Sequence, residues 1–290
     1  MAKHFFYLGK GGVGKSTISA LDSLKSAEQG YDTLLVSMDP AHNQSDIFQI
    51  ALTENPKQVI KNLHVIEINL EKQIKNYLHD IESRLKQSYR YLTAFNLENQ
   101  FNIIQYSPGI EEYALLQGYD EIAQVYSKKD MIIFDMPPTA LTLKFFNLPK
   151  LSMLWLEKLL LLRKQIIEKK EIITKIKFGK KIVETDKITK NLLDQLYTYQ
   201  KINDNFQNKT IAQIVLIMNP DMLSINESIK IKEKLRSLKM SPNRIIVNKY
   251  RDENRTIFKP FDDVDIQYFP LQTDQLMGLE NLKKYFSQFI

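Results

Sequence analysis

A glycine-rich segment near the N-terminus carries the clearest chemistry in this sequence. Residues 9–17 read GKGGVGKST and follow a short apolar run over residues 4–8. The spacing G-x-x-x-x-G-K-[ST] lets successive backbone N–H groups turn inward around polyphosphate oxygens, because glycine adopts backbone angles that other residues avoid. The segment therefore predicts a phosphate-binding loop. The alternative is a glycine-rich turn that binds no ligand.

The residues of this loop have separate predicted roles. Lys15 would contact the β- and γ-phosphates, and the hydroxyl of Ser16 would bind Mg²⁺. A helix that begins near Thr17 would direct the positive end of its dipole at the same anion. The nucleotide-binding residues predicted in the loop are Gly11, Gly12, Val13, Gly14, Lys15, Ser16 and Thr17.

Two carboxylates follow predicted strands. Asp135 closes the apolar run 131–134, and Asp39 follows the run 33–38. Ligands of open α/β sheets bind beyond the carboxyl ends of the strands. Asp135 is predicted to hold a water of the Mg²⁺ shell, as a Walker B acid does, and Asp39 to orient the attacking water. The structural alternatives are a helix N-cap for Asp135 and an Asp-Pro turn for Asp39.

Strands and helices alternate along the chain. Short apolar runs predict strands over residues 4–8, 33–38, 63–68, 101–106, 131–134, 211–218, 244–247 and 266–269. Helical patterns lie between them, and the last one covers residues 275–289. This order predicts an α/β fold with a doubly wound, mainly parallel sheet, as in P-loop NTPases. We expect one domain over residues 1–290, with helical insertions at about 70–100 and 150–205.

Composition excludes several kinds of site. The 290 residues include no cysteine, which removes disulfides, thiolate zinc sites and cysteine nucleophiles. The four histidines have no metal-ligand spacing, and only His42 lies in a segment that could act as a switch. No segment has the roughly 18 uncharged apolar residues of a membrane span. These observations predict a cytoplasmic protein without zinc.

The net charge of +6 comes from one part of the chain. Residues 150–190 contain twelve Lys or Arg and five Asp or Glu. One interpretation of this basic segment is a solvated helical face. The other is a surface that contacts an anionic membrane, an acidic partner or nucleic acid.

Several segments together resemble the ArsA and tail-anchored-protein-targeting family of P-loop ATPases. The loop at 9–17 is similar to the deviant Walker A motif of that family, which carries a signature lysine. The segments 38–46, 107–112 and 135–143 with 148–149 resemble its first switch, a further segment of that family, and its Walker B with second switch. Residues 221–227 and 247–249 complete the series in the expected order.

The resemblance implies a homodimeric, Mg²⁺-dependent ATPase that binds ATP. The signature lysine, Lys10, would cross to the nucleotide of the partner subunit, so the implied catalytic residues are Lys10, Lys15 and Asp39. Asn248 would read the adenine edge. Asp221 and Glu227 match family positions that contact the nucleotide or the facing subunit.

The sequence also departs from the family. A Cys-x-x-Cys pair, which clamps zinc between subunits in the tail-anchored targeting factor, is absent. The cysteines with which the arsenite pump senses metalloid are absent too. Ala140 and Leu141 replace the usual glycine and histidine of the second switch, from which we expect altered switch dynamics with ATP binding retained.

The apolar segment 148–162 has two interpretations, and the resemblance favours the second. It is either an ordinary core helix or part of a groove for a hydrophobic client segment, with a membrane receptor as a further partner. The leading hypothesis is an ATP-switched carrier that can be peripheral at a membrane. Alternatives are a positioning ATPase like the Min and Par proteins, acting on membrane or DNA, and a nucleotide-binding protein without turnover. We expect no nucleic-acid partner.

Overall fold

The computed structural model describes residues 2–41, 43–88, 107, 109–178, 186–251, 255–272 and 276–288. Its strands form one sheet in the order β3-β4-β2-β5-β1-β6-β7-β8. Among the strands that the structure describes, only the pairing of β3 with β4 is antiparallel. The strands are β1 (Lys3–Leu8), β2 (Thr33–Ser37), β3 (Lys57–Ile60), β4 (Leu63–Glu67), β5 (Met131–Asp135), β6 (Ala212–Met218), β7 (Arg244–Tyr250) and β8 (Asp265–Pro270).

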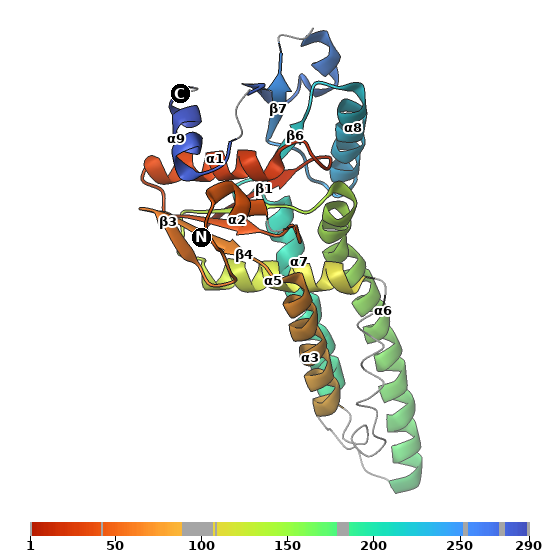
Figure 1. The fold of residues 1–290 in the computed structure, drawn as a ribbon. Helices are drawn as coiled ribbons and strands as arrows, with labels where there is room; N and C mark the ends of the chain where they lie inside the picture. The colour runs from red at the N-terminus through yellow and green to blue at the C-terminus, as the bar shows by residue number, and fades with distance from the viewer. Residues whose placement is uncertain are drawn as a thin grey trace.

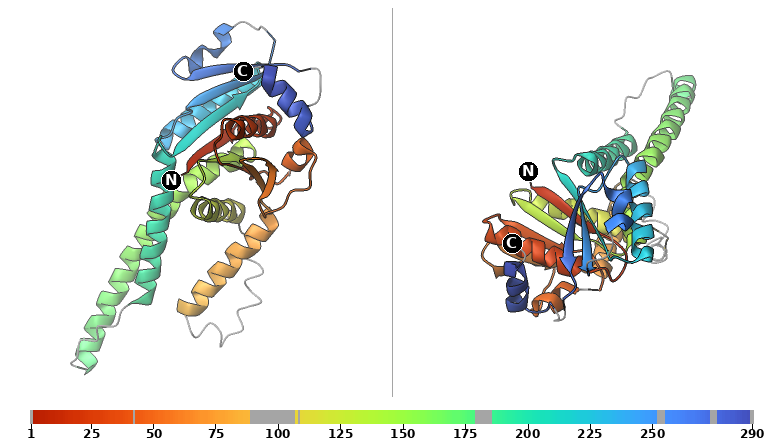
Figure 2. Two further views of the ribbon diagram at one scale, coloured as in Figure 1. Left: turned by 90° about the vertical axis from the view of Figure 1, so that its left-hand side faces the viewer. Right: turned by 90° about the horizontal axis from the view of Figure 1, so that it is seen from above.

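Helices cover both faces of this sheet (Figures 1 and 2). The helices are α1 (Lys15–Glu28), α2 (Asn43–Phe48), α3 (Leu70–Ser88), α5 (Ile110–Val125), α6 (Thr139–Phe178), α7 (Lys187–Gln207), α8 (Met222–Ser237), the 3₁₀ segment η3 (Arg255–Phe261) and α9 (Leu279–Gln288). The fold is therefore α/β with a mainly parallel sheet, as predicted.

Alternation of side chains along the strands divides the core into two layers. On one face, Phe6 of β1 packs with residues of α5, α6, α7 and α8, and aromatic rings fill much of this layer. On the other face, Tyr7 of β1 packs with residues of α1, α2 and α9. Helix α9 is part of this second layer, because its Leu282 and Tyr285 are buried there. This C-terminal helix therefore packs against the core.

Three helices extend away from the sheet body (Figure 1). They are α3, the part of α6 from about residue 150 onward, and the N-terminal part of α7, and we call this part the helical extension. The C-terminal end of α7 belongs to the body, because its Ile202 and Phe206 are buried in the core. Helices α6 and α7 run side by side (Figure 2). Arg163 of α6 forms a two-pronged ion pair with Asp186, which is also the N-cap of α7. Among the described residues, no helix combines the length and the apolar run that crossing a membrane requires.

The structure corrects several predicted boundaries. Helix α6 starts at Thr139, directly after Pro138, and not at residue 150. Pro149 lies inside this helix. Helix α9 starts at Leu279 and not at residue 275. Strand β3 and helix α2 were not predicted, since both are too short to show a clear period. The strand predicted over 101–106 lies outside the described residues.

Candidate functional site

The ends of the central strands meet at one edge of the sheet. In the parallel ladders Asp135 is level with Tyr7 of β1 and with Ser37 of β2. The glycine-rich loop leaves β1 at this edge, and Asp39 follows β2 here. The pairing of β1, β2 and β5 thus brings the predicted catalytic and metal-binding residues together at one edge of the sheet.

Two positions of the loop favour glycine. A Cβ atom on Gly9 would lie 2.2 Å from the carbonyl oxygen of Ile217, and one on Gly14 would lie 2.4 Å from Nδ2 of Asn248. Gly14, with φ of 94°, also precedes the first turn of α1 in a left-handed conformation. A side chain at Gly9 would collide with the backbone of Ile217. One at Gly14 would meet only the Asn248 side chain, so at Gly14 it is the positive φ that favours glycine.

An open cavity of about 670 Å³ lies over the loop. Its lining includes loop residues, the segment after β2, and the stretch between β8 and α9. A volume of this order suits a nucleotide, whose size is that of typical small-molecule ligands. The predicted site residues that line it are Gly11, Gly12, Gly14, Lys15, Ser16, Thr17, Asp39 and Asn248. Lys10 does not line it.

The predicted phosphate-binding loop combines positive charge with backbone N–H donors. Lys15 is buried, with only 6% of its surface exposed, at the start of α1. No acidic residue occupies the first turn of α1, so the helix dipole and the Lys15 cation both favour an anion here. Val13, within the loop, has a buried side chain, and its N–H donates to the carbonyl of Lys10 at 3.5 Å.

Asp135 is fully buried beside this loop. Its Oδ2 accepts a hydrogen bond of 3.0 Å from Gln44, and its Oδ1 has no partner among the described residues. Burial raises the pKa of the Asp135 carboxyl to about 6, while the nearby Ser16 hydroxyl, the Gln44 amide and the charge of Lys15 oppose that rise. An unpartnered buried carboxylate oxygen fits the water shell of a cation, so Asp135 and the Ser16 hydroxyl could hold Mg²⁺.

Asp39 is partly exposed in the segment that joins β2 to α2. Its Oδ1 accepts a hydrogen bond from the N–H of Ala41 at 3.1 Å, a local turn contact that leaves Oδ2 available to the cavity. In the same segment, Asn43 lies 3.5 Å from the hydroxyl of Ser16 through its Nδ2. His42 lies outside the described residues.

Asn248 follows the buried part of β7 and closes one side of the cavity. Its Nδ2 donates to the carbonyl of Val13 at 2.8 Å, and its Oδ1 accepts from the N–H of Lys249 at 2.9 Å. The amide therefore fixes the loop as well as lining the cavity, and one N–H of the amide is left for a ligand.

The structure places Asp221 and Glu227 away from the cavity. Asp221 is the N-cap of α8, where its Oδ1 accepts from the N–H of Ser224 at 2.9 Å. Glu227 accepts a hydrogen bond of 2.7 Å from the hydroxyl of Thr139, at the start of α6. Glu227 thus connects α8 to the segment that follows Asp135. Contact of either residue with nucleotide or partner stays a prediction.

Sequence reasoning missed two polar residues of the site. Gln44 is completely buried and contacts both α1 and Asp135. Lys249 has an unusual positive φ of 57°, lines the cavity, and reaches the carbonyl of Gly12 at 3.4 Å. A polar residue inside the predicted switch was the available signal for Gln44, but its burial could not be known from the sequence.

Comparison with known proteins identifies the family of this chain. A family model described as anion-transporting ATPase matches residues 2–259. This chain belongs to that family. An ATPase ASNA1 homolog from Entamoeba histolytica is 28% identical over 312 aligned residues, which cover 99% of this chain and 93% of the relative. A putative arsenical pump-driving ATPase from Aquifex aeolicus is also 28% identical, with 99% and 98% covered.

A plant relative gives the same assignment. ATPase GET3C from Arabidopsis thaliana is 31% identical over 265 aligned residues, which cover 85% of this chain and 66% of the relative. The chain is an ATPase that binds nucleotide and hydrolyses ATP, and the resemblance seen in the sequence is confirmed. The comparisons do not favour the Min- or Par-like positioning ATPase, and they argue against a protein without turnover.

Proposed function

We propose that this ATPase works with Mg²⁺ as a homodimeric switch that carries hydrophobic protein segments. The observation that carries the proposal is the different placement of two lysines of one loop. Lys15 is buried in the cavity wall, whereas Lys10 lies in the same loop and outside that wall. A lysine so placed can serve the nucleotide of a second subunit, and ATP then joins the two subunits.

Ser16 and Asp135 are the proposed Mg²⁺-binding residues. The Ser16 hydroxyl would bind the ion directly, and Asp135 would accept hydrogen bonds from waters bound to it. The fit rests on the buried, unpartnered Oδ1 of Asp135 and on its position beside the loop. When bound, the ion would supply positive charge that offsets the negative charge of the phosphates in the transition state.

Hydrolysis assigns separate tasks to this chain's own residues. Asp39 orients the water that attacks the γ-phosphorus and accepts its hydrogen bond. Lys15 and the loop N–H groups hold the phosphate oxygens, and Lys10 of the partner subunit adds a cation when the dimer closes. Such preorganised charges act mainly on the transition state, so hydrolysis is fast only in the closed dimer.

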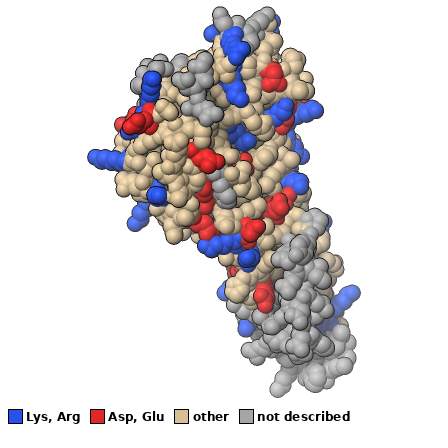
Figure 3. Space-filling model, viewed as in Figure 1, with Lys and Arg blue, Asp and Glu red and all other residues tan. Residues whose placement is uncertain are grey.

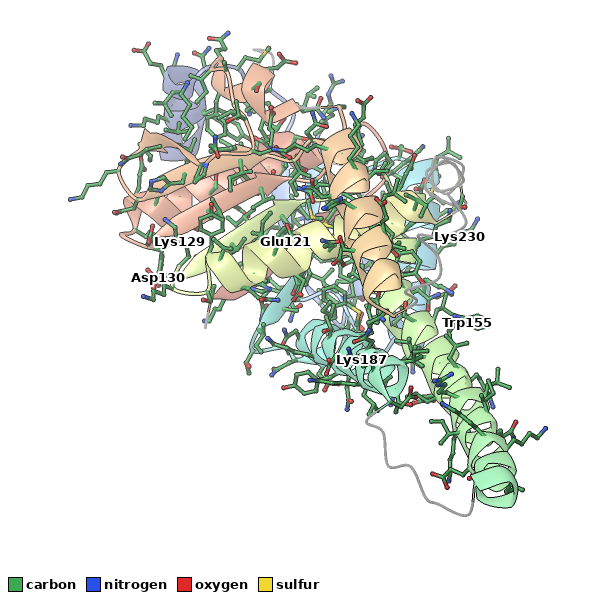
Figure 4. All side chains as sticks on the ribbon, turned by 90° about the horizontal axis from the view of Figure 1, so that it is seen from below. Glu121, Lys129, Asp130, Trp155, Lys187 and Lys230 are labelled. Atoms are coloured by element: carbon green, nitrogen blue, oxygen red, sulfur yellow. The ribbon has the colours of Figure 1, made fainter. Side chains whose placement is uncertain are left out.

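The proposed client surface is an apolar row on α6. Trp155 is 65% exposed, and Leu151, Leu154, Leu161, Leu162 and Ile166 are each more than half exposed. Figure 4 shows Trp155 on the part of α6 that leaves the sheet body. Contiguous exposed apolar side chains of this size mark interaction surfaces in soluble proteins. Leu156, on another side of the same helix, is buried, so α6 packs on the body and still exposes an apolar row.

Nucleotide-dependent dimerisation tests the switch. Light scattering of the full chain with a non-hydrolysable ATP analogue and Mg²⁺ should give a dimer, and ADP should give a smaller dimer fraction. Lys10→Ala should remove the effect of the analogue. Lys128→Ala is the matched control, because Lys128 is an exposed lysine before β5, at the opposite edge of the sheet. A wild type that stays monomeric with the analogue would exclude the proposed switch.

The client role is tested separately with the single tryptophan. Because Trp155 is the one tryptophan of the sequence, its fluorescence reports directly on α6. Addition of a hydrophobic transmembrane peptide together with the ATP analogue should shift its emission to shorter wavelength, and a polar peptide of equal length should not. An unchanged spectrum in the presence of a proven dimer would reject the client surface and leave the switch intact.

Charge does not favour the nucleic-acid alternative on the face that Figure 3 shows. Acidic and basic side chains are interspersed over the described part of the body in that view. A nucleic-acid footprint requires Lys and Arg gathered on one face. Salt-sensitive binding of the full chain to DNA at low ionic strength would revive that alternative.

A further inference from the structure

One buried amide joins three parts of the site. Gln44 of α2 has no exposed surface, and its Nε2 lies 3.0 Å from the carbonyl of Ser16, 3.2 Å from the hydroxyl of Ser19 and 3.0 Å from Oδ2 of Asp135. These acceptors belong to the first turn of α1 and to the end of β5. A single side chain of the switch segment thus contacts the helix that carries Ser16 and the acid that faces it.

The hydrogen bonding of this amide is incomplete. An amide nitrogen has two N–H groups, so three acceptors share two donors. The Oε1 of Gln44 and the Oδ1 of Asp135 are both buried and have no partner among the described residues. A buried polar atom without a hydrogen-bond partner destabilises the folded state. These two atoms therefore need donors that the described residues do not supply. Both orphaned atoms are acceptors, and water bound to a cation supplies donors.

The helix that carries Gln44 is fixed on its other side. The N–H and the hydroxyl of Ser45 both donate to the carboxylate of Glu67, at 2.7 Å each, at the end of β4. The hydroxyl of Ser45 also accepts from the N–H of Leu52 at 3.2 Å. Helix α2 is therefore held between β4 and α1, and Asp39 lies just before it.

We infer that Gln44 is a positioning residue for magnesium: its amide orients Asp135 toward the first turn of α1 and couples the segment that carries Asp39 to both. The inference rests on the proposed function, because it concerns the Mg²⁺ site of Ser16 and Asp135. Gln44 acts through these residues and touches neither nucleotide nor attacking water. A movement of the Asp39 segment would remove the Gln44 donor from Asp135, so the metal site and the water-orienting acid would change together.

The test measures the effect of Mg²⁺ on ADP affinity. Isothermal titration calorimetry of the full chain with ADP, in Mg²⁺ and in EDTA, gives the ratio of the two dissociation constants without any need for turnover. Gln44→Met keeps the length of the side chain and removes the donors. We expect the Mg²⁺-dependent gain in ADP affinity to fall about tenfold, with the affinity in EDTA unchanged within about twofold.

The matched control is Ser45→Ala in the same helix. It removes the hydroxyl of Ser45, which donates to Glu67 and accepts from Leu52. It keeps the backbone N–H bond to Glu67 and the contacts of Gln44 with Ser16 and Asp135. We expect the control to keep the wild-type gain. If Ser45→Ala reduces the gain as much as Gln44→Met, displacement of the helix explains the effect and the inference fails. It also fails if Gln44→Met keeps the full gain.

A second variant covers the case in which Gln44→Met does not fold. Gln44→Asn keeps the amide but withdraws it by one methylene, so we expect a gain reduced about threefold, and a full gain would overturn the inference. A wild type in which Mg²⁺ leaves ADP affinity unchanged would instead reject the proposed magnesium site. A wild type with the gain and variants that retain it would reject the role of Gln44 alone.

Discussion

The sheet body and the helical extension use apolar residues in opposite ways. In the body, Phe6 has no exposed surface and contacts several aromatic rings of α5, α6 and α7. In the extension, Trp155 on α6 is 65% exposed. Burial of apolar area is what stabilises a fold, so exposed apolar residues contribute little to it. The body thus supplies most of the apolar burial that stabilises the fold, whereas the extension leaves large apolar side chains exposed.

Truncating one aromatic side chain in each region gives the largest difference. Phe6→Ala should lower the free energy of unfolding by about 3–5 kcal/mol, because it leaves a cavity in a packed core. Trp155→Ala should change it by less than about 1 kcal/mol, because most of the side chain is already in water. Urea denaturation of both variants measures the difference. Equal losses would contradict the division into a packed body and an exposed α6.

The pH dependence of stability isolates a second buried group of the body. His4 of β1 is 1% exposed and shares a hydrogen bond of 3.0 Å with the hydroxyl of Tyr119. Burial lowers the pKa of His4 from 6.5 to about 4. Between pH 6.5 and 4 the imidazole of His4 is therefore protonated in the unfolded chain and neutral in the folded chain. The free energy of unfolding falls as pH falls through this range.

We expect this loss to reach about 3 kcal/mol over that range. Urea denaturation between pH 7.5 and 5 measures the upper part of it. His4→Gln, a neutral residue that can still bond to Tyr119, should have a shallower slope by the contribution of His4. The pKa of His64 is also lowered, by burial and the nearby Lys129, but His64 is present in both proteins and cancels. Identical slopes would show that His4 does not titrate as its burial implies.

Changing the acid at the catalytic edge should affect activity and leave stability unchanged. Asp39→Asn should reduce kcat for phosphate release by about a hundredfold, the effect of losing a base that orients water. Stability should change by less than about 0.5 kcal/mol, because the described contact of Asp39 is a turn hydrogen bond that asparagine can also accept.

Asp130→Asn is the control for that variant. Asp130 is an exposed carboxylate at the opposite edge of the sheet, where it accepts a hydrogen bond from the N–H of Asp32 at 2.9 Å. It should hydrolyse ATP at the wild-type rate. A reduction of less than about threefold in Asp39→Asn would assign the orientation of water to another group.

The smallest predicted effect is confined to the extension. Asp186→Ala removes both the N-cap of α7 and the ion pair with Arg163, which holds the pKa of Asp186 well below its usual range. We expect a local loss of about 1–2 kcal/mol. Hydrogen exchange should accelerate in the first turn of α7 and stay unchanged in β1 and β5. Asp194→Ala, an exposed acid on α7, is the control, and acceleration throughout the sheet would show that extension and body unfold as one unit.

Much of the fold was predictable because the signals are local. The buried strands appear as short apolar runs, and the phosphate loop is defined by the spacing of Gly9, Gly14, Lys15 and Ser16. Strand β3 and helix α2 were not predictable, because four to six residues show no reliable period. The start of α6 was misplaced, since Pro149 falls at a point where the sequence indicates a break and the structure continues the helix.

The sequence by itself determined that this chain binds a polyphosphate, because the whole chemistry of the loop lies within nine consecutive residues. It also determined the family, because the motifs occur in the right order along the chain. Only the tertiary structure decided that Gln44 meets Ser16 and Asp135, and that Trp155 remains exposed. The physical reason is that such contacts join residues far apart in the chain, and they arise from strand order and helix packing, which no local spacing encodes.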